Sequence, residues 1–393
     1  MALPLAITAA VLAFAWPAGR ISPREVPVGI VGTGPASQQA VEALTRAKPG
    51  AFDFHLYANR QAARSAIKNR DVYGAFALSG RSITVLKATA ASPSVAQLLT
   101  DVGQQLADKA TQRIARQEAV DAHSRVRDHK QAATKPDAVQ QKAARQESAG
   151  AGADSAAQIL VKAIDVVPVA AEDPRGVVFS SSVFPLTICG ILIGAFVSMA
   201  RGLAHPRLRV LTLLVACAVA ALGVHLVAQG FLGALPHHHV ATWAILSLDL
   251  LSISATAAGV VRLLGPGGLG LSAAVMVFVG NAFSGATSAP EMLPKGVDHV
   301  GQWLPPGAGA SLLRDTTYFD GNSGAGHLAV LALWSVCGLT AVMFGHWVTG
   351  KPRGTRPGAT AAGELLPAVP GSGEILSVGR HAHADARRHD GDG

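Results

Sequence analysis

Six long apolar stretches, interrupted by one large polar insert, constrain what this chain can fold into. A hydrocarbon core about 30 Å thick is crossed by roughly 20 apolar helical residues. The first stretch opens the chain, and the other five follow the insert, which runs from about Arg20 to Arg175. The sequence therefore predicts an α-helical polytopic membrane protein with six transmembrane helices. The predicted spans are Ala2–Ala18, Val177–Ala200, Leu208–Leu235, Val240–Leu264, Leu269–Ala289 and Leu328–Val348.

The composition favours the same class. Hydrophobic residues make up 49% of the 393 residues and charged residues only 15%, which is more apolar than a soluble protein of this length can hide. The chain is basic, with a formal net charge of +8, but basic residues beside membrane spans are typical of the cytoplasmic face. Because the sequence has no basic patch with interleaved aromatic residues, we do not expect it to bind nucleic acid.

The distribution of Lys and Arg predicts the orientation of the spans. Basic residues follow or close the second, fourth and sixth spans, whereas the loop Pro236–His239 has none and the longer loop Pro290–His327 has only two. This alternation indicates a multi-pass protein of the cell membrane with both termini in the cytoplasm and residues 19–176 extracytoplasmic. The basic residues concerned are Arg201, Arg207 and Arg209, then Arg262, then Lys351, Arg353 and Arg356.

The first span is open to more than one interpretation. Ala2–Ala18 lacks a basic flank and has about the length of a signal-peptide core, and Ala13-Phe14-Ala15 matches a small-residue cleavage pattern. We interpret residues 1–18 as a retained first helix; the alternative is a cleaved signal. The missing flank is also compatible with a start further upstream. Each interpretation leaves the insert outside the cytoplasm.

The insert, residues 19–176, reads in two parts. Strand and helix signals alternate over residues 26–88, which predicts a small α/β unit with its own core. From Pro93 the apolar residues recur with a helical period, so residues 93–160 are predicted to form a long helical arm, broken near Pro136. A last strand is expected at Val166–Val169. The other expected elements are strands Val26–Val31, Phe52–Tyr57, Val72–Leu78 and Ile83–Lys87, and helices Ser37–Arg46 and Gln61–Lys68.

The rest of the chain divides into a membrane part and a tail. Residues 177–349 hold the remaining five predicted spans. Residues 350–393 are rich in Gly, Pro, Ala and His, a composition that cannot build a packed core. We therefore predict a five-helix membrane domain followed by a disordered cytoplasmic tail.

Motifs for catalysis and for cofactors are missing from the sequence. Val28–Pro35 partly matches a dinucleotide-binding turn, but Ser37 stands where the third glycine would be and Pro35 interrupts the phosphate cradle. No P-loop occurs. The cysteines lie far apart inside predicted spans, unlike a metal or redox cluster. We expect no enzyme activity, no cofactor and no metal site in this chain.

Several short motifs add a resemblance to this order of parts. They are Asp173-Pro174-Arg175-Gly176 before the second span, then Pro290-Glu291-Met292-Leu293-Pro294, Trp303-Leu304-Pro305-Pro306-Gly307 and Leu313-Arg314-Asp315 before the last one. With one helix, a large insert and five more helices, the chain resembles the permease subunit of type-2 ABC exporters (ABC-2 type transporter membrane proteins). It is most similar to the phage-infection-protein branch, over residues of about 1–350.

The resemblance implies a homodimer or heterodimer of permeases in the lipid bilayer, driven by a separate ABC ATPase subunit. Two departures matter: such permeases usually begin with a cytoplasmic amphipathic helix, which is missing, and the tail resembles no domain. We expect export of a small amphipathic or lipid-like molecule. The alternative is a non-transporting membrane scaffold or surface receptor whose ectodomain binds a cell-envelope or secretion partner. A membrane enzyme is the third and weakest hypothesis.

Two loops are candidates for function. The loop Arg201–Arg209 is the longest inward loop between helices, so Arg201, Arg207 and Arg209 are predicted to touch the ATPase; alternatively they only set topology. The outer segment Pro290–Gly326 is predicted to form two short helices that dip partway into the bilayer. The alternative for that segment is a plain surface loop with Trp303 at the interface.

The third candidate is Asp249, a carboxylate inside a predicted span, where a charge is costly unless it faces a partner or water. Counting from the turn Pro236–His239 places His225 at a similar depth on the neighbouring helix. The two are predicted to form a buried pair that Gln229 can join. The functional interpretation is a polar site on the substrate path; the alternative is a structural clasp.

Overall fold

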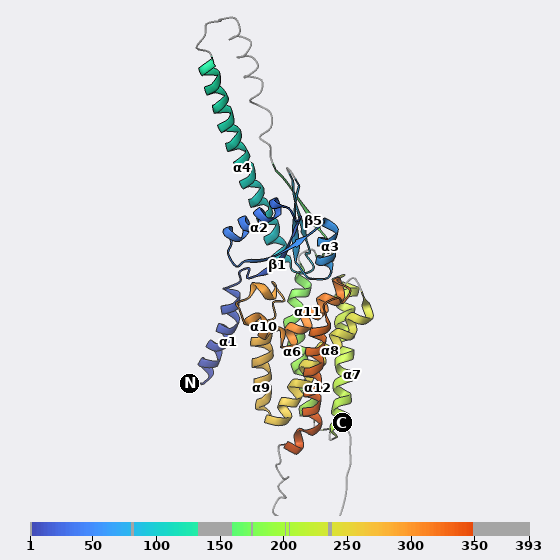
Figure 1. Cartoon of the computed structure of the whole chain (residues 1–393). Coiled ribbons are helices and arrows are strands. Elements are labelled where there is room, and N and C mark those ends of the chain that lie inside the picture. The colour runs from blue at the N-terminus through green and yellow to red at the C-terminus, as the bar shows by residue number, and fades with distance from the viewer. Residues whose placement is uncertain are drawn as a thin grey trace, which may run out of the picture. The chain divides into compact units, whose positions relative to one another are not determined.

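The computed structural model describes residues 2–79, 82–132, 159–173, 176–200, 202–203, 205–234 and 238–348. Within these ranges the chain is mostly helical and carries one five-stranded sheet (Figure 1). The predicted tail, the expected break near Pro136 and most of the second half of the predicted arm lie outside the described residues.

The sheet is built from β1 (Val26–Val31), β2 (Phe52–Tyr57), β3 (Gly74–Ser79), β4 (Ser82–Lys87) and β5 (Leu160–Asp165). The spatial order is β2-β1-β3-β4-β5, and only the β3–β4 pair is antiparallel. Helices α2 (Pro35–Ala47) and α3 (Arg60–Lys68) are the crossovers between the parallel strands. Apart from the last strand, the elements predicted for this unit are confirmed to within two residues.

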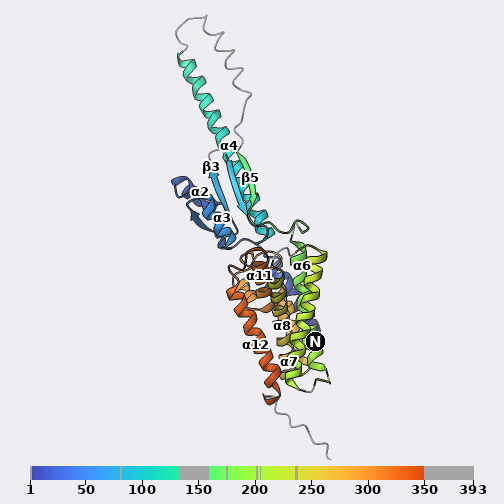
Figure 2. The same cartoon turned by 90° about the vertical axis from the view of Figure 1, so that its right-hand side faces the viewer.

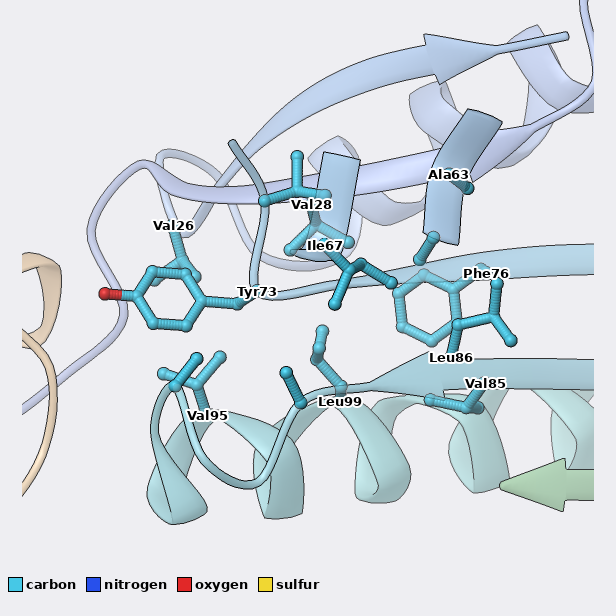
Figure 3. Close-up of a cluster of buried hydrophobic side chains, with 14 of the residues drawn as sticks. Val26, Val28, Ala63, Ile67, Tyr73, Phe76, Val85, Leu86, Val95 and Leu99 are labelled. Atoms are coloured by element: carbon cyan, nitrogen blue, oxygen red, sulfur yellow. The ribbon is translucent and has the colours of Figure 1, made fainter. Parts of the chain in front are cut away.

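An apolar cluster forms the core of this sheet (Figure 3). Val28 of β1 and Phe76 of β3 are at most 1% exposed, and Ile67 of α3 and Leu99 of α4 (Pro93–Ala132) are fully buried beside them. Burying one such side chain contributes about 1.5–3 kcal/mol. The cluster therefore holds the strands, α3 and the start of α4 together, and we call this unit the sheet domain.

Helix α4 belongs to the sheet domain only in its first turns. These turns pack on β3, β4 and β5, and Val95 and Leu99 are fully buried there. Further along, the helix leaves the sheet (Figure 1), and Val120 is 61% exposed. The apolar residues in the second half of the helix are therefore left uncovered, because the sheet is too short to reach them.

The strand expected at Val166–Val169 is a second correction. The fifth strand is Leu160–Asp165, paired in parallel with β4 along its whole length. Val166, Val167 and Val169 follow this strand and pack against the core cluster from outside the ladder. Their apolar character reflects that packing, whereas the true strand lies at the sheet's edge and is largely exposed.

Among the described residues, four helices are long and apolar enough to cross a membrane. Helix α8 lies at their centre, because it packs against α6, α7 and α12 (Figures 1 and 2). It is the most buried of the four helices. Small residues permit this packing, since a Cβ at Gly338 of α12 would overlap the backbone of α8 at Ala255. The four helices are α6 (Val177–Met199), α7 with the π-helical η1 (Pro206–Phe231), α8 (His239–Leu264) and α12 (Ala325–Val348).

The two other predicted spans are shorter helices. α1 (Ala2–Ala18) has 17 residues, and its Phe14 ring packs edge-on against Phe184 of α6 and Phe278 of η2, at 6.3 and 6.2 Å. The run expected to be helical to Ala289 ends at Asn281, because the chain turns at Gly285 (φ +66). That run consists of α9 (Gly267–Ala273) and the π-helical η2 (Ala274–Asn281).

The segment Pro290–Gly326 contains the two short helices predicted for it. They are α10 (Val297–Gln302) and α11 (Pro305–Tyr318), preceded by a single turn, η3 (Pro290–Met292). Helix α11 is buried from Pro305 to Thr317, because it packs against α8 and α12. It is part of the helical bundle and not a surface loop.

The entry to α6 explains one of the quoted motifs. Asp173 accepts hydrogen bonds from the backbone N–H groups of Val177 and Val178, both at 2.9 Å, and so caps the first turn. Gly176 has a left-handed backbone (φ +63), which glycine adopts without steric cost. Pro174 and Arg175 lie outside the described residues.

Candidate functional site

The sheet domain meets the helices through residues 282–324, a contact region that we call the junction. Met292 and Phe319 belong to the core cluster of the sheet domain itself. Ser92, at the start of α4, donates a buried hydrogen bond to the carbonyl of Ser288 at 2.6 Å. The contact is thus made of apolar packing together with buried polar bonds.

An ion pair crosses the junction. Arg70, in the turn after α3, pairs with Asp315 of α11; the side chains are 12% and 0% exposed. Ser323 donates a hydrogen bond to the same Asp315 oxygen at 3.1 Å, and His327 Nδ1 lies 3.8 Å from the other oxygen. Burial by itself lowers the pKa of Arg70, but the attraction and hydrogen bond of Asp315, together with Tyr73 and Glu291, outweigh it, so the pKa ends above its ordinary value. Arg70 is therefore charged at neutral pH.

A second buried contact lies beside this pair. The Tyr73 hydroxyl donates to Glu291 Oε2 at 2.6 Å, and Figure 3 shows the Tyr73 ring in the core cluster with its hydroxyl at the cluster's edge. Burial raises the pKa of Tyr73, and the nearby Glu291 carboxylate raises it further. Arg314 is 4% exposed, donates to the carbonyl of Ala286 at 3.0 Å and lies over the ring of Phe179. Four ionisable side chains, Arg70, Glu291, Arg314 and Asp315, thus lie in a contact that is buried on its bundle side, where losing one partner is costly.

A cleft of about 370 Å³ opens above these groups. That volume lies in the range of small-molecule sites. Its walls come from the turn between α3 and β3 on one side and from η3, α10 and α11 on the other. The lining side chains are mostly polar: Arg70, Tyr73, Glu291, Asp298, His299, Gln302, Ser311, Ser323 and His327, with Pro27, Val72, Ala91 and Pro290 as the apolar part.

A line of hydrogen bonds leads from the cleft into the helices. Ser311 donates to Gln302 Oε1 at 2.7 Å, and Gln302 donates to the carbonyl of Ser284 at 2.9 Å. Ser284 donates to the carbonyl of Asn281 at 2.8 Å, and the amide oxygen of Asn281 lies 3.4 Å from the hydroxyl of Thr187 of α6, which donates at 2.9 Å to the Val183 carbonyl. Thr187 is 1% exposed. A polar route therefore extends from the cleft to the buried faces of η2 and α6.

Asp249 lies in the middle of α8 and is 8% exposed. Its carboxylate packs against Gly309 of α11, where a Cβ would overlap it. Oδ1 has no hydrogen-bond partner among the described residues. An unsatisfied carboxyl oxygen in an apolar bundle is costly, which is the kind of cost that a functional site carries.

The predicted pair between Asp249 and His225 is not formed. The His225 ring packs edge-on against His239, with centroids 5.9 Å apart. His239 begins α8, ten residues before Asp249, which corresponds to about 15 Å along a helix. The prediction assumed helical rise on both sides of a short turn, whereas the helix that carries His225 continues only as the π-helical η1 (Leu226–Phe231) and ends there, eight residues before His239. Gln229 lies in η1, half-buried.

The predicted coupling arginines differ from one another. Arg209 donates hydrogen bonds to the backbone carbonyls of Leu203 and Ser198, at 2.6 and 2.7 Å. Ser198 lies in the last turn of α6, where backbone carbonyls have no partner within the helix. Arg207 is exposed and is free to meet a partner. Arg201 lies outside the described residues.

Comparison with known proteins gives no relative: no protein-family model, no curated protein and no solved structure matches this chain. Sequence reasoning had singled out the segments that carry Glu291, Arg314 and Asp315, but only as motifs. It missed Arg70 and Tyr73, because a lone Arg and a lone Tyr in a surface-like turn carry no pattern. The available signal was the pair of adjacent opposite charges, Arg314 and Asp315, in the otherwise uncharged α11, which could have indicated a buried polar contact.

Proposed function

We propose that this chain is the membrane-embedded permease subunit of an exporter, which moves a small amphipathic or lipid-like molecule out of the cell with a separate ATPase subunit. The single observation that carries the proposal is the buried Asp249 carboxyl against Gly309 of α11, the helix whose Ser311 lines the cleft. A polar route through an apolar bundle serves transport better than it serves stability.

In this proposal the sheet domain lies outside the cell, and six spans, α1 and α9–η2 included, cross the bilayer. Two observations bear on this arrangement. Trp303, at the end of the bundle near the junction, is 64% exposed, as Trp at either membrane interface is. Arg207, Arg209 and Arg262 lie at the opposite ends of their helices, where the positive-inside rule places the cytoplasm.

The junction gives the exporter a means of coupling. Asp315 is held by Arg70 of the sheet domain, and Gly309 on the same helix touches Asp249. Six residues of helix separate the two positions, about 9 Å. A displacement of the sheet domain would therefore shift α11 against Asp249, so α11 links the outer domain to the route.

The ATPase contact is assigned to Arg207. Arg207→Ser is expected to weaken co-purification of an ABC ATPase, identified by mass spectrometry, without changing membrane insertion. Arg209→Ser is the matched variant: it removes the same charge from the same loop, but its expected effect is on the α6–α7 connection and thus on thermal stability. Equal ATPase recovery from wild type and Arg207→Ser would remove Arg207 from the contact.

Export is tested in a strain of the source organism that lacks the gene for this chain and is complemented with variants of it. Lipid and small-molecule extracts of cells and medium are compared by mass spectrometry to find species whose release depends on the chain. Wild type and Ser247→Ala, whose hydroxyl bonds only within α8, are expected to restore release, and Asp249→Asn to fail despite normal expression. Release restored by all three would contradict a role for Asp249.

The alternative, a scaffold or receptor, is favoured by one observation. The second half of α4 stands clear of the sheet, with Val120 and Val126 61% and 59% exposed. Suppose that no species depends on the chain for release, but that the wild type corrects another phenotype of the deletion strain. If Val120→Asp with Val126→Asp then fails to correct that phenotype, the arm and not the route carries the function.

A further inference from the structure

The chemistry of the cleft at the junction indicates what it binds. Its lining carries three charged side chains, Arg70, Glu291 and Asp298. Directly behind it lie Asp315, bonded to Arg70, and the buried Arg314. Two positive and three negative charges leave one negative charge when the imidazoles are neutral. A positively charged group would balance the cleft, and an anion would add to its excess.

The carboxylates are also unequally satisfied. Asp315 is held through Oδ1 by Arg70 and Ser323, whereas its buried Oδ2 has no hydrogen-bond partner among the described residues; Glu291 accepts from Tyr73 with one oxygen. Asp298 faces the cleft with a side chain 25% exposed. Its Oδ1 is covered by protein and has no hydrogen-bond partner among the described residues, while its Oδ2 lies 3.9 Å from His299 Nε2. Asp298 is thus a partly exposed carboxylate that offers Oδ2 to the cleft and is paired with no Lys or Arg among the described residues.

The other walls of the cleft fit the neighbourhood of an amine. Ser311 and Gln302 present hydroxyl and amide oxygens, which accept hydrogen bonds from N–H donors. Pro27, Val72 and Pro290 form an apolar side that can cover hydrocarbon next to the charged head. A bare metal ion fits less well, since no cluster of three or more His, Cys, Asp or Glu side chains occurs among the described residues, and metal ions prefer such ligand sets.

We propose that this cleft binds the ammonium head of a small amine, with Asp298 as the principal acceptor and Glu291 as the second. That the amine is the head group of the exported amphiphile rests on the proposed function; the binding itself does not. The same charge excess argues against carboxylate or phosphate heads.

The test uses the full chain in zwitterionic lipid nanodiscs, with empty nanodiscs as the background. Binding of hexylammonium, hexanol and hexanoate is measured by calorimetry at neutral pH. Only hexylammonium is expected to bind saturably, and Asp298→Asn is expected to weaken it about tenfold, the effect of losing one charge-assisted hydrogen bond. Glu25→Gln, which removes an exposed carboxylate outside the cleft, is expected to leave binding unchanged.

Equal binding of the alcohol and the amine, or unchanged affinity in Asp298→Asn, would overturn the proposal, as would the lack of saturable amine binding. The export experiment depends on Asp249 and on chain-dependent release, not on the cleft. A failure of amine binding with release intact therefore rejects only this inference, and bound amine with no released species rejects only the exporter.

Discussion

The core of the sheet domain and the junction beside it are both buried, but they are built from opposite materials. The core contains Val28, Ile67, Phe76 and Leu99. The attraction between these apolar side chains has no preferred direction, but their close packing tolerates only small changes of side-chain shape. The junction is held in addition by Arg70 and Asp315, by Tyr73 and Glu291, and by hydrogen bonds of fixed geometry.

The difference separates stability from orientation. Apolar packing stabilises the sheet domain whatever it is attached to. A buried ion pair is weak evidence for stability, because desolvation offsets most of the Coulomb gain. Its retention in a contact that apolar residues could make suggests that it fixes how the sheet domain sits on α11. The predictions below challenge this contrast.

The largest effect is expected in the core. Phe76→Ala should lower the free energy of unfolding by about 3–5 kcal/mol, through lost burial and a cavity. Chemical unfolding in detergent, followed by circular dichroism, measures it. Leu56→Ala on the edge strand β2, with 45% exposure, is the control and should stay within about 0.5 kcal/mol. Similar losses at both sites would mean that the sheet domain has no distinct core.

The next effect is at the ion pair. Arg70→Ala leaves Asp315 buried without a cation and should lower the free energy of unfolding by about 3 kcal/mol. This loss is near the lower end for a broken buried pair, because Ser323 still donates a hydrogen bond to Asp315. The double variant Arg70→Met with Asp315→Leu should recover most of this loss, since apolar side chains of similar volume need no partner. If the double variant is as unstable as the single one, the pair is a stabilising element after all.

A smaller effect is expected for Tyr73→Phe, which removes one hydrogen bond to a carboxylate, about 1.5 kcal/mol. The pH dependence sharpens this. The pKa of Tyr73 is raised in the folded state, so above pH about 10 the unfolded chain releases a proton that the folded chain keeps, and stability falls as pH rises. Unfolding measured from neutral to alkaline pH should show a shallower fall in Tyr73→Phe. Parallel curves would contradict the burial of this hydroxyl.

The smallest effect is expected at the junction's rim. Lys295 and Glu25 form an ion pair at 2.6 Å with side chains 73% and 64% exposed. Solvent and salt screen such pairs, so Glu25→Gln should change stability by less than about 1 kcal/mol. A thermal shift comparable to that of Arg70→Ala would show that exposure does not separate the two kinds of pair.

The sequence predicted the elements of this fold well where one physical signal dominated. Alternation and turn residues located four of the five strands, and apolar length located the four long helices. Where two effects competed, prediction failed. Val166–Val169 is apolar because it packs beside the ladder, and the span expected to reach Ala289 is cut short by a turn at Gly285.

The candidate site was less predictable, for a geometric reason. Asp249 was identified because a carboxylate in an apolar run is conspicuous, but its neighbour is Gly309 and not His225. That neighbour depends on the π-helical turn η1 and on α11 folding into the bundle. Arg70 and Asp315 are 245 residues apart, and only the packed structure brings them together.

The central claim is that α11 links the sheet domain to Asp249. A double-mutant cycle with Arg70→Ala and Asp249→Asn, using unfolding free energies of the full chain in nanodiscs, tests it most directly. The two side chains contact α11 about 9 Å apart along its axis, a separation at which independent sites are additive within about 0.3–0.5 kcal/mol. We predict a coupling energy larger than about 0.5 kcal/mol. Additivity within error would contradict the account, because the junction and the buried carboxyl would then be separate features of one fold.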